Sequence, residues 1–131
     1  MADPIFLTLA QVLCLHARQI ERFGGDPGVR DLKLVESAVA QPQQGFGGEF
    51  FHKTLAEIAA AYLFHLVQNH GFIDGNKRAG AAAALVFLEL NGIDTDPIDD
   101  DEMESLTLAI ACGQADKSAA AQFFARYAVA D

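Results

Sequence analysis

The chain has 131 residues, of which 51% are hydrophobic and 21% are charged, and its formal net charge is -9. This length fits a single domain over residues 1–131 that buries about two-thirds of its unfolded surface, and the composition excludes a disordered chain. The longest apolar stretch, Ala79 to Leu88, is far shorter than the ~20 residues that a membrane span requires. The acidic balance argues against direct nucleic-acid binding, because such a surface repels phosphate.

Two helices are expected in the first third of the chain. The first covers residues 8–23, where apolar residues recur with the helical period, and Thr8 can cap its N-terminus. The glycine pair at 24–25 ends it, since glycine commonly follows a helix. The second helix covers residues 31–40, and a proline two residues later prevents its continuation.

Residues 41–53 form the longest irregular segment, in which glycines alternate with phenylalanines. We find no convincing pair of strands in this segment or elsewhere in the chain. A helix is expected next over residues 54–70, because Thr54 and Glu57 have the spacing of a capping box. Residues 71–75 then form a short glycine-containing loop.

The helix expected over residues 76–90 has no polar face. Its first half is mostly alanine and glycine, and its second half is apolar. A helix of this kind is usually central and surrounded by others. Two further helices are expected over residues 99–112 and 118–128. The sequence therefore predicts an all-α fold of five or six helices packed around the alanine-rich one.

Neither the N-terminus nor the cysteines indicate secretion. The N-terminal residues MADPIFLTLAQVL have no basic segment before their apolar part, so we expect a cytoplasmic protein without a secretory signal. Cys14 and Cys112 are too few for a disulfide framework, and neither has the neighbours that a zinc site needs. We interpret both as reduced thiols in the core.

The segment HGFIDGNKR, which begins at His70, has the features of a phosphate site. One helix ends at His70 and the next begins at Asn76, and the first turn of a helix offers unpaired N–H groups and a positive dipole end to an anion. Gly75 permits close approach of a ligand to the backbone. Lys77 and Arg78 add two cationic donors, of which the guanidinium suits phosphate oxygens.

Two more side chains of this segment suit catalysis. A carboxylate beside an anion site is repulsive unless a cation separates the charges, so Asp74 is a candidate ligand for Mg²⁺, which one or two carboxylates and substrate phosphates typically hold. The ordinary pKa of histidine, about 6.5, suits His70 to act as a general base near neutral pH. The sequence therefore predicts a base and a metal carboxylate beside a phosphate site.

HGFIDGNKR resembles the signature of the Fic/Doc family: His, any residue, Phe, any residue, Asp or Glu, Gly or Ala, Asn, Gly or Lys, Arg. The likeness extends to GGDPGVRD and to LVFLELNG on either side of the segment. This resemblance implies a small helical domain in which His70 deprotonates a target hydroxyl and Asp74 holds Mg²⁺ on the phosphates of a nucleotide. It further implies that Gly75 and Asn76 shape an anion hole, that Arg78 grips phosphate, and that Phe72 anchors the loop in the core.

Lys77 and Ala81 place the resemblance in the Doc branch of that family. The AMP-transferring branch has glycine in place of Lys77 and usually arginine in place of Ala81. The Doc branch implies a toxin that acts as a protein kinase, which transfers the γ-phosphate of ATP to a threonine of elongation factor Tu and stops translation. We find no internal inhibitory motif, so the resemblance also implies a separate antitoxin protein as partner.

Alternatives stay open at this point. The chain can be an AMP transferase, or a catalytically silent binding module with the same fold. The glycine-aromatic segment 45–51 can be a plain surface loop, or the flap that the resemblance implies beside the active site, where a target adds as a strand. We interpret the remaining histidines, His16, His52 and His65, as structural. We interpret the acidic run 94–104 as a solvated loop and helix start, because it lacks the residues of a calcium loop.

Overall fold

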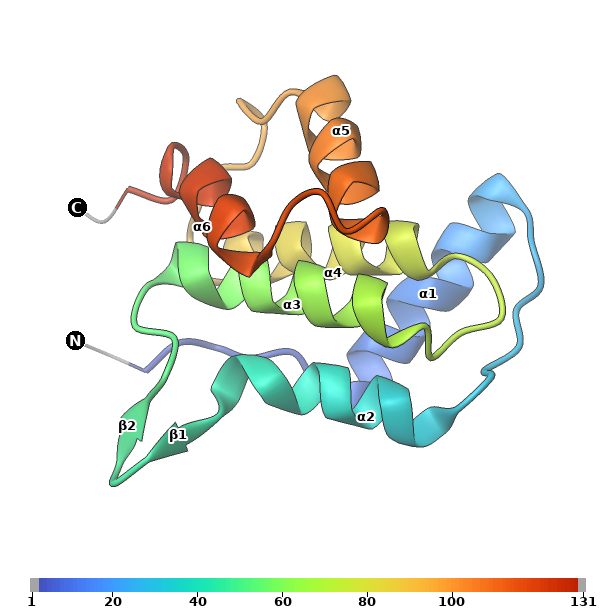
Figure 1. Cartoon of the computed structure of the whole chain (residues 1–131), viewed down its shortest axis with the longest axis horizontal. Coiled ribbons are helices and arrows are strands. Elements are labelled where there is room, and N and C mark those ends of the chain that lie inside the picture. The colour runs from blue at the N-terminus through green and yellow to red at the C-terminus, as the bar shows by residue number, and fades with distance from the viewer. Residues whose placement is uncertain (1–2, 130–131) are drawn as a thin grey trace.

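The computed structural model describes residues 3–129. It contains six α-helices (Figure 1): α1 (Leu9–Phe23), α2 (Leu32–Ala40), α3 (Leu55–Asn69), α4 (Asn76–Leu90), α5 (Asp100–Ala111) and α6 (Lys117–Ala125). Between α2 and α3 lie a short 3-10 helix, η1 (Gln41–Gln43), and two strands, β1 (Gly45–Phe46) and β2 (Glu49–Phe50). The predicted all-α class is confirmed. In this part of the chain no helix has both the length and the apolar character that crossing a membrane requires.

Local side-chain contacts explain where two of the helices begin. Thr8 accepts a hydrogen bond from the N–H of Gln11, whose side chain accepts from the N–H of Thr8 in return, which is a complete capping box. Thr54 caps α3 by accepting from the N–H of Glu57 at 3.1 Å. The Glu57 carboxylate accepts from the N–H of Lys53 and not from that of Thr54, so only the first half of the predicted capping box is present at α3.

Helix α3 is the most enclosed element of the fold. It packs against α2, α4, α5 and α6, and nine of its 15 residues are buried. The alanine-rich α4 packs against α1, α3 and α5, but one of its sides is only half-buried, at Ala81, Ala82, Leu85 and Val86. That side forms one wall of a cavity. Helix α4 therefore lacks a polar face because part of its surface packs against other helices and part lines this cavity.

The contact between α3 and α4 is close because Gly80 has no side chain. A Cβ atom at Gly80 would lie 2.9 Å from Cγ2 of Val67 and 3.2 Å from the carbonyl oxygen of Leu63. Helix α3 also bonds the N-terminal segment: the buried Tyr62 accepts a hydrogen bond from the N–H of Leu7 at 2.8 Å. Burial raises the pKa of Tyr62 to about 12, so the hydroxyl stays protonated. The contact at Gly80 sets how closely α3 and α4 approach, and the bond of Tyr62 ties α3 to the segment before α1.

The prediction that the chain has no strand pair is wrong, because β1 and β2 form an antiparallel hairpin with Gly45 opposite Phe50. Two-residue strands are too short to show an alternating pattern. The hairpin lies at the opposite end of α3 from His70 (Figure 1), and a helix of this length extends roughly 22 Å. Of the two alternatives left open for this segment, the structure favours a surface hairpin over a flap beside His70.

The prediction of core positions for the cysteines is wrong as well. Cys14 and Cys112 are both free, as expected, but both are exposed. The inward side of α1 is formed by Val12, His16 and Ile20, which recur every four residues, and Cys14 falls on the opposite side. Cys112 lies at the C-terminal end of α5, past its last buried residue. An apolar periodic pattern around a residue thus does not determine whether the side chain of that residue points into the core or toward solvent.

Candidate active site at the start of helix α4

The loop between α3 and α4 begins with a strained residue. His70 follows α3 with φ 51° and ψ 44°, and it is the one non-glycine residue with a positive φ among residues 3–129. The left-handed region costs an L-residue roughly 1–2 kcal/mol, and glycine is the usual choice at this position after a helix. Strain of this kind concentrates at functional sites, where the surrounding structure holds it in place.

The centre of the loop is anchored by Phe72, as expected. Phe72 is buried and its ring stacks on that of His16, with centroids 3.7 Å apart. The Asn76 amide closes the loop around Phe72: its Nδ2 donates to the carbonyl of Phe72, and its Oδ1 accepts from the N–H of Phe72, both at 3.0 Å. The two hydrogen bonds fix the Asn76 side chain against Phe72, and its backbone N–H at the start of α4 is available to the predicted anion hole.

His16, interpreted from the sequence as structural, holds this loop from α1. Its ring is buried, and Nε2 lies 2.7 Å from the carbonyl oxygen of Asp74. A carbonyl only accepts, so Nε2 carries the proton in this contact. The sequence offered no signal for this role, because 58 residues separate the two partners.

Gly75 leaves the start of α4 open to a ligand. It occupies the N-cap position with φ 80°, and no side chain caps this helix. A Cβ atom there would lie 3.1 Å from Cδ1 of Ile20. A helix start without a side-chain cap keeps N–H donors available, and these donors together with the helix dipole attract an anion.

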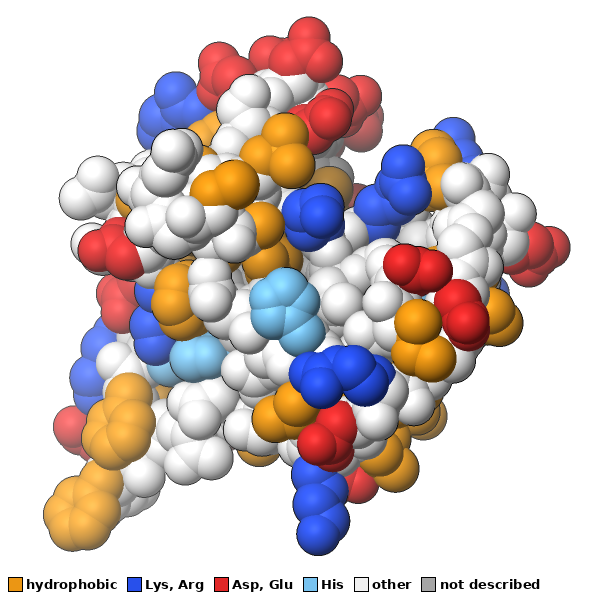
Figure 2. All heavy atoms as spheres, turned by 45° about the vertical axis from the view of Figure 1, so that its right-hand side comes forward, with side chains coloured by type: hydrophobic (Ala, Val, Ile, Leu, Met, Phe, Trp, Pro, Cys, Tyr) orange, Lys and Arg blue, Asp and Glu red, His pale blue; other side chains and the backbone are white. Residues whose placement is uncertain are grey.

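The start of α4 opens into a cavity of about 780 Å³ between α1, α4 and α5. One end of the cavity is basic, with Arg22, Lys77 and Arg78, and the end near the start of α5 is acidic, with Glu89, Asp100 and Glu104. The space-filling view in Figure 2 shows Lys and Arg side chains around a hollow and acidic side chains on the lobe above it. In a protein of net charge -9 this basic end is a local exception suited to phosphates.

The predicted site residues divide between this cavity and the loop that precedes it. Four of them line the cavity: Gly75, Asn76, Lys77 and Arg78. His70 and Asp74 lie outside the lining and are exposed in the loop. The structure thus separates the candidate base and metal carboxylate from the phosphate end of the cavity by the turn at Gly75.

Arg78 contacts an aromatic ring that the sequence interpretation missed. Its guanidinium carbon lies 4.5 Å from the ring centroid of Phe23, and that of Arg22 lies 5.2 Å from the same ring. Cation–π contacts of this kind contribute about 0.5–1 kcal/mol at exposed sites. Phe23 therefore holds two guanidinium groups at the basic end of the cavity.

Asp74 has a structural partner and retains the capacity to bind a cation. Its Oδ2 accepts from the N–H of Asp26 at 2.8 Å, which ties the loop to the turn after α1. No cluster of three or more potential metal ligands occurs within residues 3–129. A single carboxylate oxygen fits a Mg²⁺ ion that arrives with a nucleotide, because phosphates and water supply the other ligands of such an ion.

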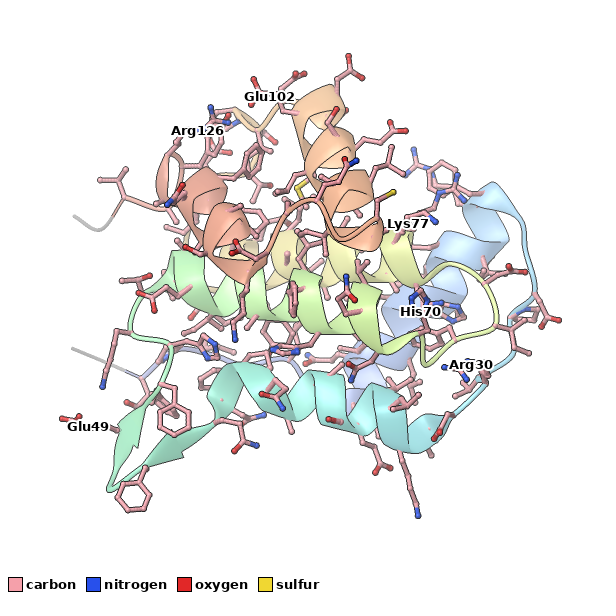
Figure 3. All side chains as sticks on the ribbon, in the orientation of Figure 1. Arg30, Glu49, His70, Lys77, Glu102 and Arg126 are labelled. Atoms are coloured by element: carbon pink, nitrogen blue, oxygen red, sulfur yellow. The ribbon has the colours of Figure 1, made fainter. Side chains whose placement is uncertain are left out.

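The sequence interpretation also missed Arg30, which the structure places beside His70. The two residues and Lys77 lie at the same end of the molecule, with His70 between the other two (Figure 3). Arg30 Nε donates to the carbonyl oxygen of His70 at 2.7 Å. The available signal was the stretch GGDPGVRD, which contains Arg30 and resembles the family outside its signature segment.

The other two histidines lie away from this loop. Burial, and then the charge of Lys117, lower the pKa of His65 to about 4. The same two causes lower the pKa of His52. Both are therefore neutral near pH 7, which agrees with the structural interpretation made from the sequence.

Comparison with known proteins identifies the family of this chain. Residues 6–88 match the model of the Fic/DOC family. The chain is 39% identical over 109 residues to "Toxin Doc" of Mycolicibacterium smegmatis, covering 82% of this chain and 84% of that protein. It is 33% identical over 116 residues to "Protein kinase doc" of Escherichia phage P1, covering 88% of this chain and 90% of that protein. The chain therefore belongs to the Fic/DOC family.

Proposed function

We propose that this protein is a toxin that acts in the cytoplasm as an ATP- and Mg²⁺-dependent protein kinase on a Ser or Thr hydroxyl of a translation factor, namely elongation factor Tu. The observation that carries the proposal is the uncapped start of α4, which opens beside Lys77 and Arg78 into the basic end of the cavity. The loop of residues 71–75 separates His70 from this helix start. The names of the two relatives, one a toxin and one a protein kinase, support the same reaction class.

The proposed reaction uses His70 as general base. The imidazole takes the proton of the target hydroxyl while that oxygen forms a bond to the γ-phosphorus, and the bond between this phosphorus and the bridging β–γ oxygen breaks to release ADP. The backbone N–H groups after Gly75 and the side chains of Lys77 and Arg78 stabilise the negative charge of the transferred group. Asp74 would hold Mg²⁺, which neutralises charge on the phosphates.

Lys77 and Ala81 favour transfer of the γ-phosphate over transfer of AMP. Both residues line the cavity, Lys77 at its phosphate end. The Lys77 side chain fills space that a glycine would leave to another phosphate, and the alanine at 81 supplies no second guanidinium for that placement. The nucleotide then presents its terminal phosphate to the helix start.

Transfer from two differently labelled nucleotides tests this proposal. The protein is incubated with purified elongation factor Tu and ATP labelled at the α- or the γ-phosphate. We expect label on the factor from γ-labelled ATP only, and Lys77→Gly should lose this signal. Label from α-labelled ATP would replace the kinase proposal by AMP transfer. No label from either nucleotide, in elongation factor Tu or in a whole lysate, would overturn enzymatic function in favour of a binding module.

The toxin proposal includes an antitoxin partner. Expression of the protein alone should stop growth, and co-expression of its antitoxin should restore growth. The His70→Ala variant, produced at the same level, serves as the matched control and should permit growth without the antitoxin. Normal growth with abundant folded wild-type protein would contradict the toxin role.

A further inference from the structure

The turn between α1 and α2 forms several backbone hydrogen bonds with the candidate catalytic loop. The N–H groups of Arg30 and Asp31 both donate to the carbonyl oxygen of Gly71, at 2.9 and 3.0 Å. The N–H of Ile73 donates to the carbonyl oxygen of Gly28 at 3.1 Å. Two segments about 40 residues apart in the chain therefore form one bonded unit, and Arg30 lies within it.

The side chain of Arg30 continues this unit toward His70. Its Nε donates to the carbonyl oxygen of His70 at 2.7 Å, and Nη2 lies 3.5 Å from the carbonyl oxygen of Asn69. The last carbonyl groups of a helix have no partner within the helix, and they carry the negative end of its dipole. The guanidinium of Arg30 donates hydrogen bonds to these carbonyl groups and places a positive charge at the negative end of the dipole. Arg30 therefore caps α3 from another segment of the chain.

This cap acts on the backbone of the candidate base itself. His70 occupies the left-handed region, which glycine would adopt without strain, and it is exposed, so little packing restrains it. In such a setting the hydrogen bond to its carbonyl group restrains the peptide unit that follows the Cα atom bearing the imidazole. Figure 3 shows Arg30 on one side of His70 and Lys77 on the other.

We infer that Arg30 is a positioning residue for catalysis, which holds His70 in its left-handed conformation so that the imidazole is directed toward the reacting hydroxyl. This inference rests on the proposed role of His70 as general base. Arg30 forms no ion pair among the residues that the structure describes, and its side-chain hydrogen bonds reach only the two carbonyl groups at the end of α3. Its charge is therefore directed to the backbone of the candidate base.

Kinetics of two substitutions test the inference. Arg30→Ala should lower kcat by about 10- to 100-fold, because a misplacement of the base by about 1 Å is sufficient for losses of that order, and should change the KM for ATP by less than about twofold. Arg30→Lys, which retains one cationic donor but lacks the fork, should recover part of kcat. Added guanidinium ion at low millimolar concentration should restore part of the activity of Arg30→Ala and none of that of His70→Ala.

Asn91→Ala provides the matched control. Asn91 also uses its side chain to pin main-chain groups at a helix end, since it bonds both the N–H and the carbonyl of Ile5 and the carbonyl of Phe87, but it lies at the far end of α4. This substitution should lower the melting temperature and leave kcat within about twofold of the wild type. An equal loss of kcat in Asn91→Ala and Arg30→Ala, or a wild-type kcat in Arg30→Ala, would overturn the inference.

The NMR signals of the four histidine rings separate this inference from the proposed reaction. In Arg30→Ala, we expect the ring signals of His70 to shift and broaden, while those of His52 and His65 stay unchanged. This measurement needs no turnover. Failure of the wild-type protein to transfer phosphate would refute the proposed function alone, whereas unchanged His70 signals would refute the positioning role of Arg30 whatever the reaction.

Discussion

The two ends of α3 differ in how firmly the chain beyond them is held. After its C-terminal end, side chains from three different elements bond the loop of residues 70–75: His16 from α1, Arg30 from the turn before α2, and Asn76 from α4. Before its N-terminal end, the β1–β2 hairpin has two residues per strand, and Phe46 and Phe51 are 84% and 63% exposed. Many contacts therefore hold the loop after the C-terminal end of α3, and few hold the hairpin before its N-terminal end.

This difference indicates where chemistry is possible. A residue such as His70 keeps a strained backbone only where neighbouring groups hold it. The same contacts occupy the side chain of Asn76 and leave the N–H groups at the start of α4 available to a ligand. The hairpin offers exposed aromatic surface, but it has no comparable set of fixed polar groups. The predictions below test this contrast, from the largest expected effect to the smallest.

Removal of the candidate base should have the largest effect. We expect His70→Ala and His70→Gly to lower the rate of phosphate transfer by roughly 10²–10⁴-fold, which is the usual contribution of a general base. His70→Gly should melt at a temperature at or above that of His70→Ala, because glycine adopts a positive φ without strain. Transfer at the wild-type rate in both variants would remove His70 from the mechanism.

Asp74 should affect the metal dependence of nucleotide binding. Asp74→Asn keeps an oxygen that can accept from the N–H of Asp26, but it removes the charge that a cation needs. Calorimetry should therefore show nucleotide affinity about tenfold weaker in Mg²⁺ and nearly unchanged in EDTA. Asp74→Ala also removes the hydrogen bond and should lower the melting temperature. Equal losses of affinity with and without Mg²⁺ would identify Asp74 as a purely structural carboxylate.

Asn76→Ala should loosen the bonded end of α3. This substitution leaves the N–H and the carbonyl of the buried Phe72 without their partners. We expect the free energy of unfolding to fall by about 1–3 kcal/mol, the usual cost of unpaired buried polar groups, with loss of transfer activity. Denaturant unfolding measures the first effect. Wild-type stability would show that water replaces the amide, and would weaken the contrast between the two ends.

His65, on the side of α3 that faces α6, should make the free energy of unfolding depend on pH. Burial and Lys117 lower the pKa of His65 to about 4, whereas the unfolded chain titrates near 6.5. Between these values the unfolded state binds more protons than the folded state, so the free energy of unfolding decreases as the pH falls from 6.5 to 4. In melting curves, His65→Gln should show a smaller decrease over this range. An identical slope in both proteins would contradict the lowered pKa.

Changes in the hairpin should have the smallest effect. Phe46→Ser and Phe51→Ser alter exposed side chains, so the free energy of unfolding should change by less than about 0.5 kcal/mol. Transfer kinetics with a saturating target should stay within about twofold of the wild type, because the hairpin is remote from His70. A loss of activity as large as that of Asn76→Ala would show that both ends of α3 contribute to the reaction.

The sequence by itself predicts the features that depend on neighbouring residues. Helical periods, the caps at Thr8 and Thr54, and the glycine turn at Gly75 are local, and the structure confirms them. The segment HGFIDGNKR likewise indicates the family, which the comparisons confirm. The roles of its residues in catalysis and metal binding stay predictions.

Only the tertiary structure decides which distant groups meet. His16 reaches Asp74 across 58 residues and Arg30 reaches His70 across 40, and no local pattern encodes either contact. Packing likewise turns Cys14 outward and leaves one side of α4 as the wall of a cavity. Periodicity specifies that a helix has an inward face, but the direction of each side chain and its partners depend on how all the helices pack together.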